Sequence, residues 1–302
     1  MNIAVILTCF NRKAKTLKCL ESLFAARDAY ATGHPDEALS LSIYLTDDGC
    51  TDGTADAVRQ LLTGKDLHII QGNGTLYWAG GMRAAWREAL KVGGWDYYLL
   101  LNDDTVVVKD AFVELVNTQC YCLNEYKRKG IYSGITCDTN DGSIITYGGD
   151  VWVDRLKATA RRLPPSSAPQ LCDMTNANIL LVPAEVVEEI GIFHDGYRHG
   201  IADYDYSIQA RGHGIPVLIT ANVCGACDND HDSDAETREK ICAMSFGERR
   251  KYFKNPLHSN KDYLTFIKRC APKRYGMVCL GRFLNSYLPK LYYWLDDKMR
   301  GK

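Results

Sequence analysis

The sequence of 302 residues has neither a large net charge nor a long apolar run. Lys and Arg total 36 and Asp and Glu total 37, a formal net charge of −1, so the chain lacks the basic balance of a general nucleic-acid binder. No apolar stretch reaches the roughly 18 to 20 residues that span a bilayer. The best stretch, 275–295, is interrupted by Arg282, Asn285, Pro289 and Lys290. We expect no transmembrane helix and no nucleic-acid partner.

Two common phosphate-binding loops are also missing. The sequence contains no G-x-x-x-x-G-K-[ST], and the glycines after the first predicted strand do not form G-x-G-x-x-G. A P-loop ATPase or a nicotinamide-dependent enzyme is therefore not expected.

The start of the sequence does not predict export. No basic segment precedes the short apolar run at the start of the sequence, which is not the pattern of a signal peptide. The 12 cysteines are scattered, and in a cytoplasmic protein we expect them to be reduced and mostly buried. Cys224 and Cys227 form a lone C-x-x-C, which favours neither a zinc finger nor a thioredoxin-like site.

What the sequence does contain is an alternation of strand-like and helix-like patterns. Buried-strand runs are predicted at 3–10, 42–46, 67–70 and 97–101, and each is followed by apolar residues at helical spacing. Further strands are predicted at 131–135, 144–152, 179–182 and 216–220, with a short helix at 204–211. This order predicts an α/β fold with a mainly parallel central sheet and helices on both faces. Ligands of such sheets bind beyond the carboxyl ends of the strands.

Acidic pairs follow two of these strands. Asp47 and Asp48 end one strand, and Asp103 and Asp104 end another, so parallel order brings both pairs to one edge of the sheet. Carboxylates gathered there repel each other unless a cation lies between them, and oxygen ligands suit Mg²⁺ or Mn²⁺. The alternative is that these residues cap the helices that follow.

Four segments of the sequence resemble motifs of the family 2 glycosyltransferases, which have the GT-A fold, and they occur in the order expected for that family. They are 6–12 (ILTCFNR), 46–54 (TDDGCTDGT), 101–105 (LNDDT) and the Gly-rich 73–82 (NGTLYWAGGM), the last being similar to the rhamnosyltransferase-like branch. The resemblance covers residues 1 to about 235. It implies a GT-A domain at 1–240 and leaves 241–302 as a helical carboxy-terminal extension.

The resemblance also implies roles for individual residues. Asp104 would bind the metal, Mg²⁺ or Mn²⁺, and Asn102 stands where the family has the first acid of its D-x-D-type motif, so a ribose or phosphate contact is expected of it. The residues expected to contact the nucleotide are Thr8, Asn11, Asp47, Asp48, Asn102 and Asp103. The residues expected to line the donor and acceptor pocket are Trp78, Gly80, Gly81 and Asp205.

A second matching segment supplies the expected general base. Family members carry an acid pair, one further residue and another acid, and the second acid of the pair is the base; here the segment reads Ala202-Asp203-Tyr204-Asp205. Asp203 therefore falls on the base position, while Asp205 is expected at the helix start or at the acceptor. Because Ala202 replaces the first acid, a like charge that could raise the pKa of Asp203 is missing. The resemblance implies a single displacement with inversion; the alternative role for Asp203 is a helix cap.

An acidic loop at 228–239 contains the second expected metal ligand, His231. Family members often place a His after the last core strand to complete the metal shell. The spacing of acids in this loop is also similar to an EF-hand loop, but Ser233 stands at the glycine position and a strand precedes it. A solvated acidic loop is the other interpretation.

The last part of the chain is basic and aromatic. From residue 246 onward there are 14 basic and 4 acidic residues, and 11 of the 31 aromatic residues. This composition fits a surface that lies on anionic lipid, or helices whose basic face packs against the acidic body.

Together these observations predict an inverting glycosyltransferase that uses a nucleoside-diphosphate sugar donor and a divalent metal. The acceptor is expected to be a glycan or a lipid-linked hydroxyl, and the protein cytoplasmic or peripheral on the inner face of the membrane. The alternative is a catalytically weak or inactive nucleotide-sugar- or glycan-binding protein of the same fold, because Ala202 and Asn102 depart from the family pattern. A sugar nucleotidyltransferase is disfavoured, since no G-x-G-T-R-type loop follows the first strand.

Overall fold

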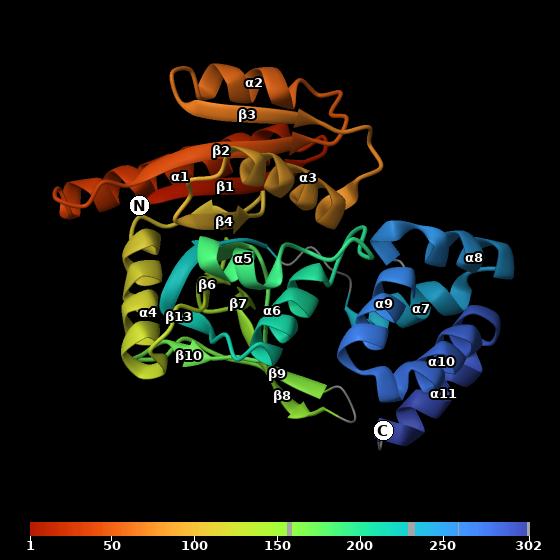
Figure 1. Ribbon diagram of the computed structural model, residues 1–302. Helices are drawn as coiled ribbons and strands as arrows, with labels where there is room; N and C mark the ends of the chain where they lie inside the picture. Colours follow the sequence, from red (N-terminus) through yellow and green to blue (C-terminus); the bar gives the residue numbers. More distant parts are fainter. Residues whose placement is uncertain (156–158, 229–232, 259, 301–302) are drawn as a thin grey trace.

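A computed structural model describes residues 1–155, 159–228, 233–258 and 260–300 (Figure 1). The amino-terminal part alternates strands and helices as predicted. Its elements are β1 (Asn2–Cys9), α1 (Lys13–Gly33), β2 (Ser40–Asp47), α2 (Thr54–Leu61), β3 (Asp66–Gln71), α3 (Tyr77–Val92), β4 (Tyr97–Leu101), β5 (Val106–Val107) and α4 (Ala111–Tyr126). Strands β1 to β4 pair in parallel, in the order β4-β1-β2-β3.

The middle part completes the central sheet and adds a small second sheet. Its elements are β6 (Ile131–Cys137), β7 (Ile145–Tyr147), β8 (Gly149–Asp154), β9 (Thr159–Arg162), β10 (Gln170–Leu171), β11 (Met174–Thr175), β12 (Ile179–Pro183), α5 (Ala184–Ile190), α6 (Ala202–Gly212) and β13 (Val217–Ala226). Strand β12 joins the sheet antiparallel to β4 and β6, whereas β13 is parallel to β6. The single strand predicted at 144–152 is two strands, because β7 pairs with β6 in the central sheet and β8 pairs with β9 and β11 in the second sheet.

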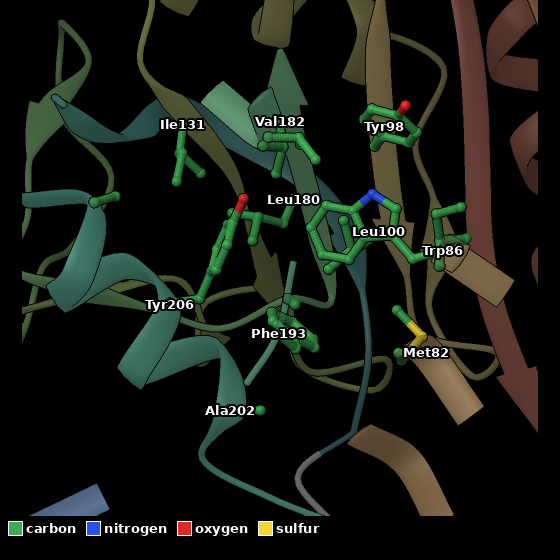
Figure 2. Packing of buried hydrophobic residues seen from close by; sticks show 14 of the residues in the cluster. Met82, Trp86, Tyr98, Leu100, Ile131, Leu180, Val182, Phe193, Ala202 and Tyr206 are labelled. Atoms are coloured by element: carbon green, nitrogen blue, oxygen red, sulfur yellow. The ribbon is translucent and has the colours of Figure 1, made fainter. Parts of the chain in front are cut away.

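The core has two layers, one on each face of the central sheet. On the face that bears α3 and α6, the rings of Trp86, Phe193 and Tyr206 meet one another with centroids 5.5 to 5.6 Å apart (Figure 2). Ala202, the first residue of α6, is fully buried in the same cluster. This packing fixes the start of α6, and hence the position of Asp203, against the sheet.

The carboxy-terminal extension is helical, as predicted. Its elements are α7 (Asp234–Ala243), α8 (Phe246–Lys254), the 3₁₀ turn η1 (Pro256–His258), α9 (Asn260–Cys270), the 3₁₀ turn η2 (Pro272–Arg274), α10 (Tyr275–Tyr287) and α11 (Pro289–Arg300). The boundary predicted at residue 240 falls inside α7, and α7 packs on α11. Among the described residues, none of the helices combines the length and the apolar character needed to cross a bilayer.

The extension is fixed to the body beside the carboxyl ends of the parallel strands (Figure 1). The carboxylate of Asp262 in α9 accepts hydrogen bonds from the backbone N–H groups of Arg198, at 3.0 Å, and His199, at 2.8 Å. A buried carboxylate that accepts two amides holds the loop before α6 in one conformation. The loop that carries this part of the site is therefore positioned partly by the extension.

Candidate functional site

A cavity of about 650 Å³ lies beyond the carboxyl ends of β1 and β4. Both the amino-terminal motifs and the segment at the start of α6 contribute to its wall, as does η1 of the extension. Its lining residues are Arg12, Trp78, Asn102, Asp104, Thr146, Tyr147, Arg162, Asn176, Asn178, His199, Gly200, Ile201, Asp203, Tyr204, Asp228 and Leu257. Of the residues assigned from sequence, the cavity thus brings together Trp78, Asn102, Asp104 and Asp203.

Asp203 is a buried carboxylate at the cavity wall. It is 8% exposed, and its oxygens accept hydrogen bonds from the backbone N–H groups of Ala177 and Tyr204, both at 3.0 Å. Burial disfavours the ionised form and raises the pKa of Asp203 to about 6, although these amides and a hydrogen bond from the Asn176 side chain act in the opposite direction. A carboxylate with this pKa can accept a proton at neutral pH and is a stronger base than an exposed aspartate.

The burial of Ala202 gives a physical reason for the missing acid. Its side chain is 1% exposed within the apolar cluster shown in Figure 2. An ionised carboxylate there would be desolvated without a partner, which is strongly unfavourable. Desolvation alone raises the pKa of Asp203, so the like charge of a neighbouring acid is not needed for that purpose.

The acidic pair after β4 is held by Arg12. One guanidinium nitrogen lies 3.2 Å from Asp103, and another makes a closer ion pair with Asp104. Asp103 is 5% exposed and also accepts a hydrogen bond from Thr16 at 3.1 Å; its burial raises its pKa to about 6, against the effect of Arg12. Asp103 therefore faces α1 rather than the cavity, whereas Asp104 lines it.

The carboxylate oxygens on the cavity wall fit a metal ion that binds together with the substrate. Mg²⁺ commonly uses one or two carboxylates and substrate phosphates as ligands. Asp104 is one carboxylate on the cavity wall, and in this structure it is paired with Arg12. Asp228 is a further carboxylate on the cavity wall. His231, the other expected ligand, lies outside the described residues.

A different cluster has the closest spacing of possible metal ligands within the described ranges. It consists of Cys9, Asp47 and Cys50, whose ligand atoms all lie within 4.8 Å of one another. Two sulfur donors do not suit Mg²⁺ or Mn²⁺, burial raises the pKa of both thiols, and Asp47 already accepts the N–H of Cys50 at 2.7 Å. This cluster is therefore a structural feature of the loops and not the expected metal site.

Asn102 and Trp78 form one unit in the cavity wall. The indole N–H of Trp78 donates to the side-chain oxygen of Asn102 at 2.8 Å, and the ring packs against Phe193 with centroids 5.5 Å apart. The family acid would offer an oxygen at this position too, but Asn102 does so without adding a charge beside Asp103 and Asp104. These contacts hold the indole at the cavity wall, and an aromatic ring there is suited to contact a sugar or a base.

Asp48 holds the loop that leads into α3. Its two oxygens accept the N–H groups of Gly74, Leu76 and Tyr77 at 2.9 to 3.0 Å, and the residue is 3% exposed. A Cβ at Gly72 would lie 2.6 Å from one of these oxygens. Asp48 therefore acts on the Gly-rich segment and does not line the cavity; direct contact with a nucleotide remains a prediction.

Other residues assigned to the nucleotide or donor pocket pack the surrounding elements together. The side chain of Asn11, at a positive φ of 51°, accepts the N–H of Thr51 at 2.7 Å and so joins the loops after β1 and β2. A Cβ at Gly81 would lie 2.1 Å from the hydroxyl of Thr8, so α3 can approach β1 this closely only with glycine there. Gly80 donates its N–H to the carbonyl of Arg198 at 3.3 Å. None of these residues is among those that line the cavity.

Asp205 is not among the residues that line the cavity, and acceptor contact by it stays a prediction. Its carboxylate is 2% exposed and pairs with Arg269 of α9 at 2.9 and 3.0 Å. It also accepts hydrogen bonds from Gln209 at 3.2 Å and from the thiol of Cys270 at 3.1 Å. Asp205 thus fastens the extension to α6 and points away from the cavity.

Sequence reasoning missed a charged network from the second sheet. Arg162 in β9 lines the cavity and pairs with Asp150 at 2.8 Å, and Asp150 also accepts the hydroxyl of Tyr204 at 2.8 Å. The four-residue strand of Arg162 is too short to give a periodic signal. No motif marks these residues, so only the topology reveals that Arg162 and Tyr204 line the same cavity as Asp203 and Asp104.

Comparison with known proteins supports the same fold. Residues 4–120 match the model of Glycosyl transferase family 2, and none of the curated proteins matches the chain in sequence. A crystal structure of S. aureus TarS 1-349 aligns with 100% of this chain and 92% of its own, at 12% identity and a TM-score of 0.56. The complex of TarS 1-349 with UDP gives the same identity and coverage and a TM-score of 0.55, and the complex with UDP-GlcNAc covers 95% and 81% of the two chains, at 13% identity and a TM-score of 0.51. The chain therefore has the GT-A fold, and its residues 4–120 match glycosyl transferase family 2.

Proposed function

We propose that this chain is an inverting glycosyltransferase that moves a sugar from a nucleoside-diphosphate donor to a hydroxyl of a glycan or lipid-linked acceptor. The observation that carries the proposal is that Asp203 and Asp104, far apart in the chain, line one cavity beyond the parallel strands. The match of residues 4–120 to glycosyl transferase family 2 supports the same reaction class. UDP and UDP-GlcNAc in the TarS structures support a nucleotide-sugar donor.

Asp203 acts as the general base in this proposal. It takes the proton of the acceptor hydroxyl while the acceptor oxygen forms a bond to the anomeric carbon and the bond between that carbon and the diphosphate oxygen breaks. General-base assistance of this kind contributes roughly 10²- to 10⁴-fold. Attack from the side opposite the leaving group inverts the anomeric configuration, so one base is sufficient.

Asp104 would hold Mg²⁺ or Mn²⁺ together with the donor, and His231 is the second proposed ligand. When bound, the metal offsets the charge that develops on the departing diphosphate. Arg12 leaves Asp104 as the donor binds and keeps its positive charge beside the phosphates. The indole of Trp78, fixed by Asn102, packs against the donor sugar or its base.

The donor is proposed to be linked to uridine or deoxythymidine. The segment 73–82, with Trp78 at the cavity, favours rhamnose as the sugar; the TarS complexes favour a uridine nucleotide. A thermal-shift screen of uridine-, deoxythymidine- and guanosine-linked sugars with Mn²⁺ separates these donors, because a ligand that binds the native state raises the unfolding temperature by mass action.

Calorimetric titration of the selected donor tests the metal site. Asp104→Ala should lose the Mn²⁺-dependent part of donor affinity. Asp110→Ala is the matched control, because Asp110 is exposed at the start of α4 and its side chain makes no capping hydrogen bond. Unchanged Mn²⁺ and donor affinity in Asp104→Ala would contradict the role of this residue.

A nucleotide-sugar-binding protein without turnover is the second candidate. The observation that favours it is the ion pair of Arg12 with Asp104, which occupies the proposed metal ligand. Incubation of the protein with its donor and Mn²⁺, without acceptor, distinguishes the two. Slow release of the nucleoside diphosphate identifies an enzyme, whereas tight binding of an intact donor identifies a binding protein.

A further inference from the structure

The outer helices of the extension expose many large apolar side chains. Seven large apolar residues in α10, in α11 or at the junction between these helices are 43% to 60% exposed: Met277, Leu280, Phe283, Tyr287, Leu288, Leu291 and Trp294. We call these seven residues the apolar face. Single exposed apolar residues are common on proteins, but contiguous groups of this kind mark binding surfaces.

The spacing of the apolar face makes it continuous along each helix. Positions 277, 280, 283 and 287 recur at helical spacing on α10, and 288, 291 and 294 do so at the start of the next helix. The rings of Phe283 and Tyr287 stack with centroids 4.5 Å apart, and Phe246 of α8 lies 4.9 Å from Tyr287. The opposite sides of the helices are occupied by their contact with each other: a Cβ at Gly281 would lie 3.3 Å from the ring of Tyr292.

Positive charges border the apolar face. Lys273 is exposed in η2, just before α10, and Lys290 and Lys298 are exposed in α11. The ammonium of Lys298 lies 4.1 Å from the ring centroid of Trp294. The segment from 246 onward carries 14 basic and 4 acidic residues. A second copy would bring two strongly positive segments together, whereas an anionic lipid surface complements both the apolar and the basic residues.

We propose that the apolar face docks this protein onto an anionic membrane, with α10 and α11 lying in the plane of the interface. These helices have 13 and 12 residues, shorter than the roughly 20 that a spanning helix needs. Tryptophan, tyrosine and lysine, which border or belong to the apolar face, are the side chains typical of the interfacial region. The docking does not depend on the proposed reaction.

The extension that carries the apolar face also forms part of the cavity wall. Leu257 of η1 lines the cavity, and η1 packs on α8 of the same extension. Asp262 and Arg269 of α9 fix the extension to the loop before α6 and to α6 itself. A lipid-carried acceptor is therefore the acceptor class that docking would favour.

Vesicle flotation of the full chain tests the proposal. We expect binding to vesicles of phosphatidylglycerol and phosphatidylcholine, weak binding to phosphatidylcholine alone, and release from the anionic vesicles at high salt, because surface attraction is screened. The double variant Leu280→Ser, Phe283→Ser should lower the affinity at least tenfold. Val92→Ser is the matched control, because Val92 is 61% exposed in the body, outside the extension. The Val92→Ser protein should bind anionic vesicles as tightly as the unmodified protein does.

Two further measurements keep the test decisive. Thermal unfolding of the double variant checks that exposed positions were changed without loss of the fold; if it unfolds early, Trp294→Ser replaces it. The proposal is overturned if the unmodified protein does not bind anionic vesicles. It is also overturned if the double variant and Trp294→Ser both bind these vesicles as tightly as the unmodified protein does. Concentration-dependent dimerisation that the double variant abolishes, without vesicle binding, would assign the apolar face to self-association. Donor affinity measured in solution reports on the proposed function separately.

Discussion

Replacing Asp203 by Asn should change the pH dependence of folding stability as well as the reaction. Burial raises the pKa of Asp203 from 3.8 to about 6 in the folded protein. An acid whose folded pKa is raised lowers stability as the pH rises from its unfolded pKa to its folded pKa, because the folded state resists losing the proton. In Asp203→Asn this loss cannot occur.

The magnitude follows from the two pKa values. A shift of about two units corresponds to about 3 kcal/mol when the pH passes from well below the lower value to well above the higher one, and to about 2 kcal/mol between pH 4 and pH 7. An amide cannot accept both the Ala177 and the Tyr204 N–H groups as the carboxylate does. A protonated carboxyl group cannot do so either, so the effect of these hydrogen bonds is already contained in the pKa of Asp203. Any cost of the substitution that does not depend on pH shifts the whole stability curve and leaves its slope unchanged.

The assay is urea unfolding of both proteins from pH 4 to pH 7. We expect the free energy of unfolding of Asp203→Asn, relative to the unmodified protein, to rise by about 2 kcal/mol over this range, since the other titrating groups are common to both proteins. Turnover of the variant should fall by 10²-fold or more. A relative stability that does not change with pH would refute the inferred burial of an ionisable Asp203 and leave it as a helix cap.

Three other predictions concern residues around the cavity. Arg12→Ala should raise the affinity for Mn²⁺ measured without nucleotide, because the cation paired with Asp104 is removed, and should weaken donor binding. Mn²⁺ titration followed by electron paramagnetic resonance measures the metal affinity. An unchanged Mn²⁺ affinity would count against displacement of the arginine. Gly81→Ala should destabilise the fold by about 1 to 3 kcal/mol, because the added Cβ overpacks the contact with β1. Gly80→Ala is its control: the added Cβ would meet its nearest atom at 3.4 Å, so this variant should be neutral or slightly stabilised by helix propensity. Equal urea midpoints for the two variants would contradict the close approach of α3 to β1. Asp205→Ala should cost about 2 kcal/mol or more, since it leaves its arginine partner unpaired, with turnover per folded molecule close to normal; selective loss of turnover would restore a role at the acceptor.

The sequence was sufficient to predict the parallel part of the sheet and four of the residues that line the cavity. Strand runs such as 97–101 are apolar and end in acids, and parallel topology alone brings such ends to one edge. This reasoning predicted that Asp104 would lie at the ligand edge, and the family motif gave the base position to Asp203. Both lie on the cavity wall.

Residues of the same type could not be separated by sequence when their partners are distant. Asp48 and Asp104 both follow strands, but the carboxylate of Asp48 accepts hydrogen bonds from the amides of a loop more than 20 residues later. The carboxylate of Asp205 pairs with an arginine 64 residues later. The contribution of Arg162 depends on a short strand in a second sheet, whose pairing is set by tertiary contacts rather than by periodicity. Local pattern carries no information about such pairings.

The most direct test of the account is the release of nucleoside diphosphate by the unmodified protein and by Asp203→Asn, each with the selected donor, Mn²⁺ and acceptor. The account predicts that turnover of the unmodified protein rises with pH through about 6, the pKa of Asp203, and that Asp203→Asn binds the donor normally but releases at least a hundredfold less product. Equal release by the two proteins at neutral pH would contradict it.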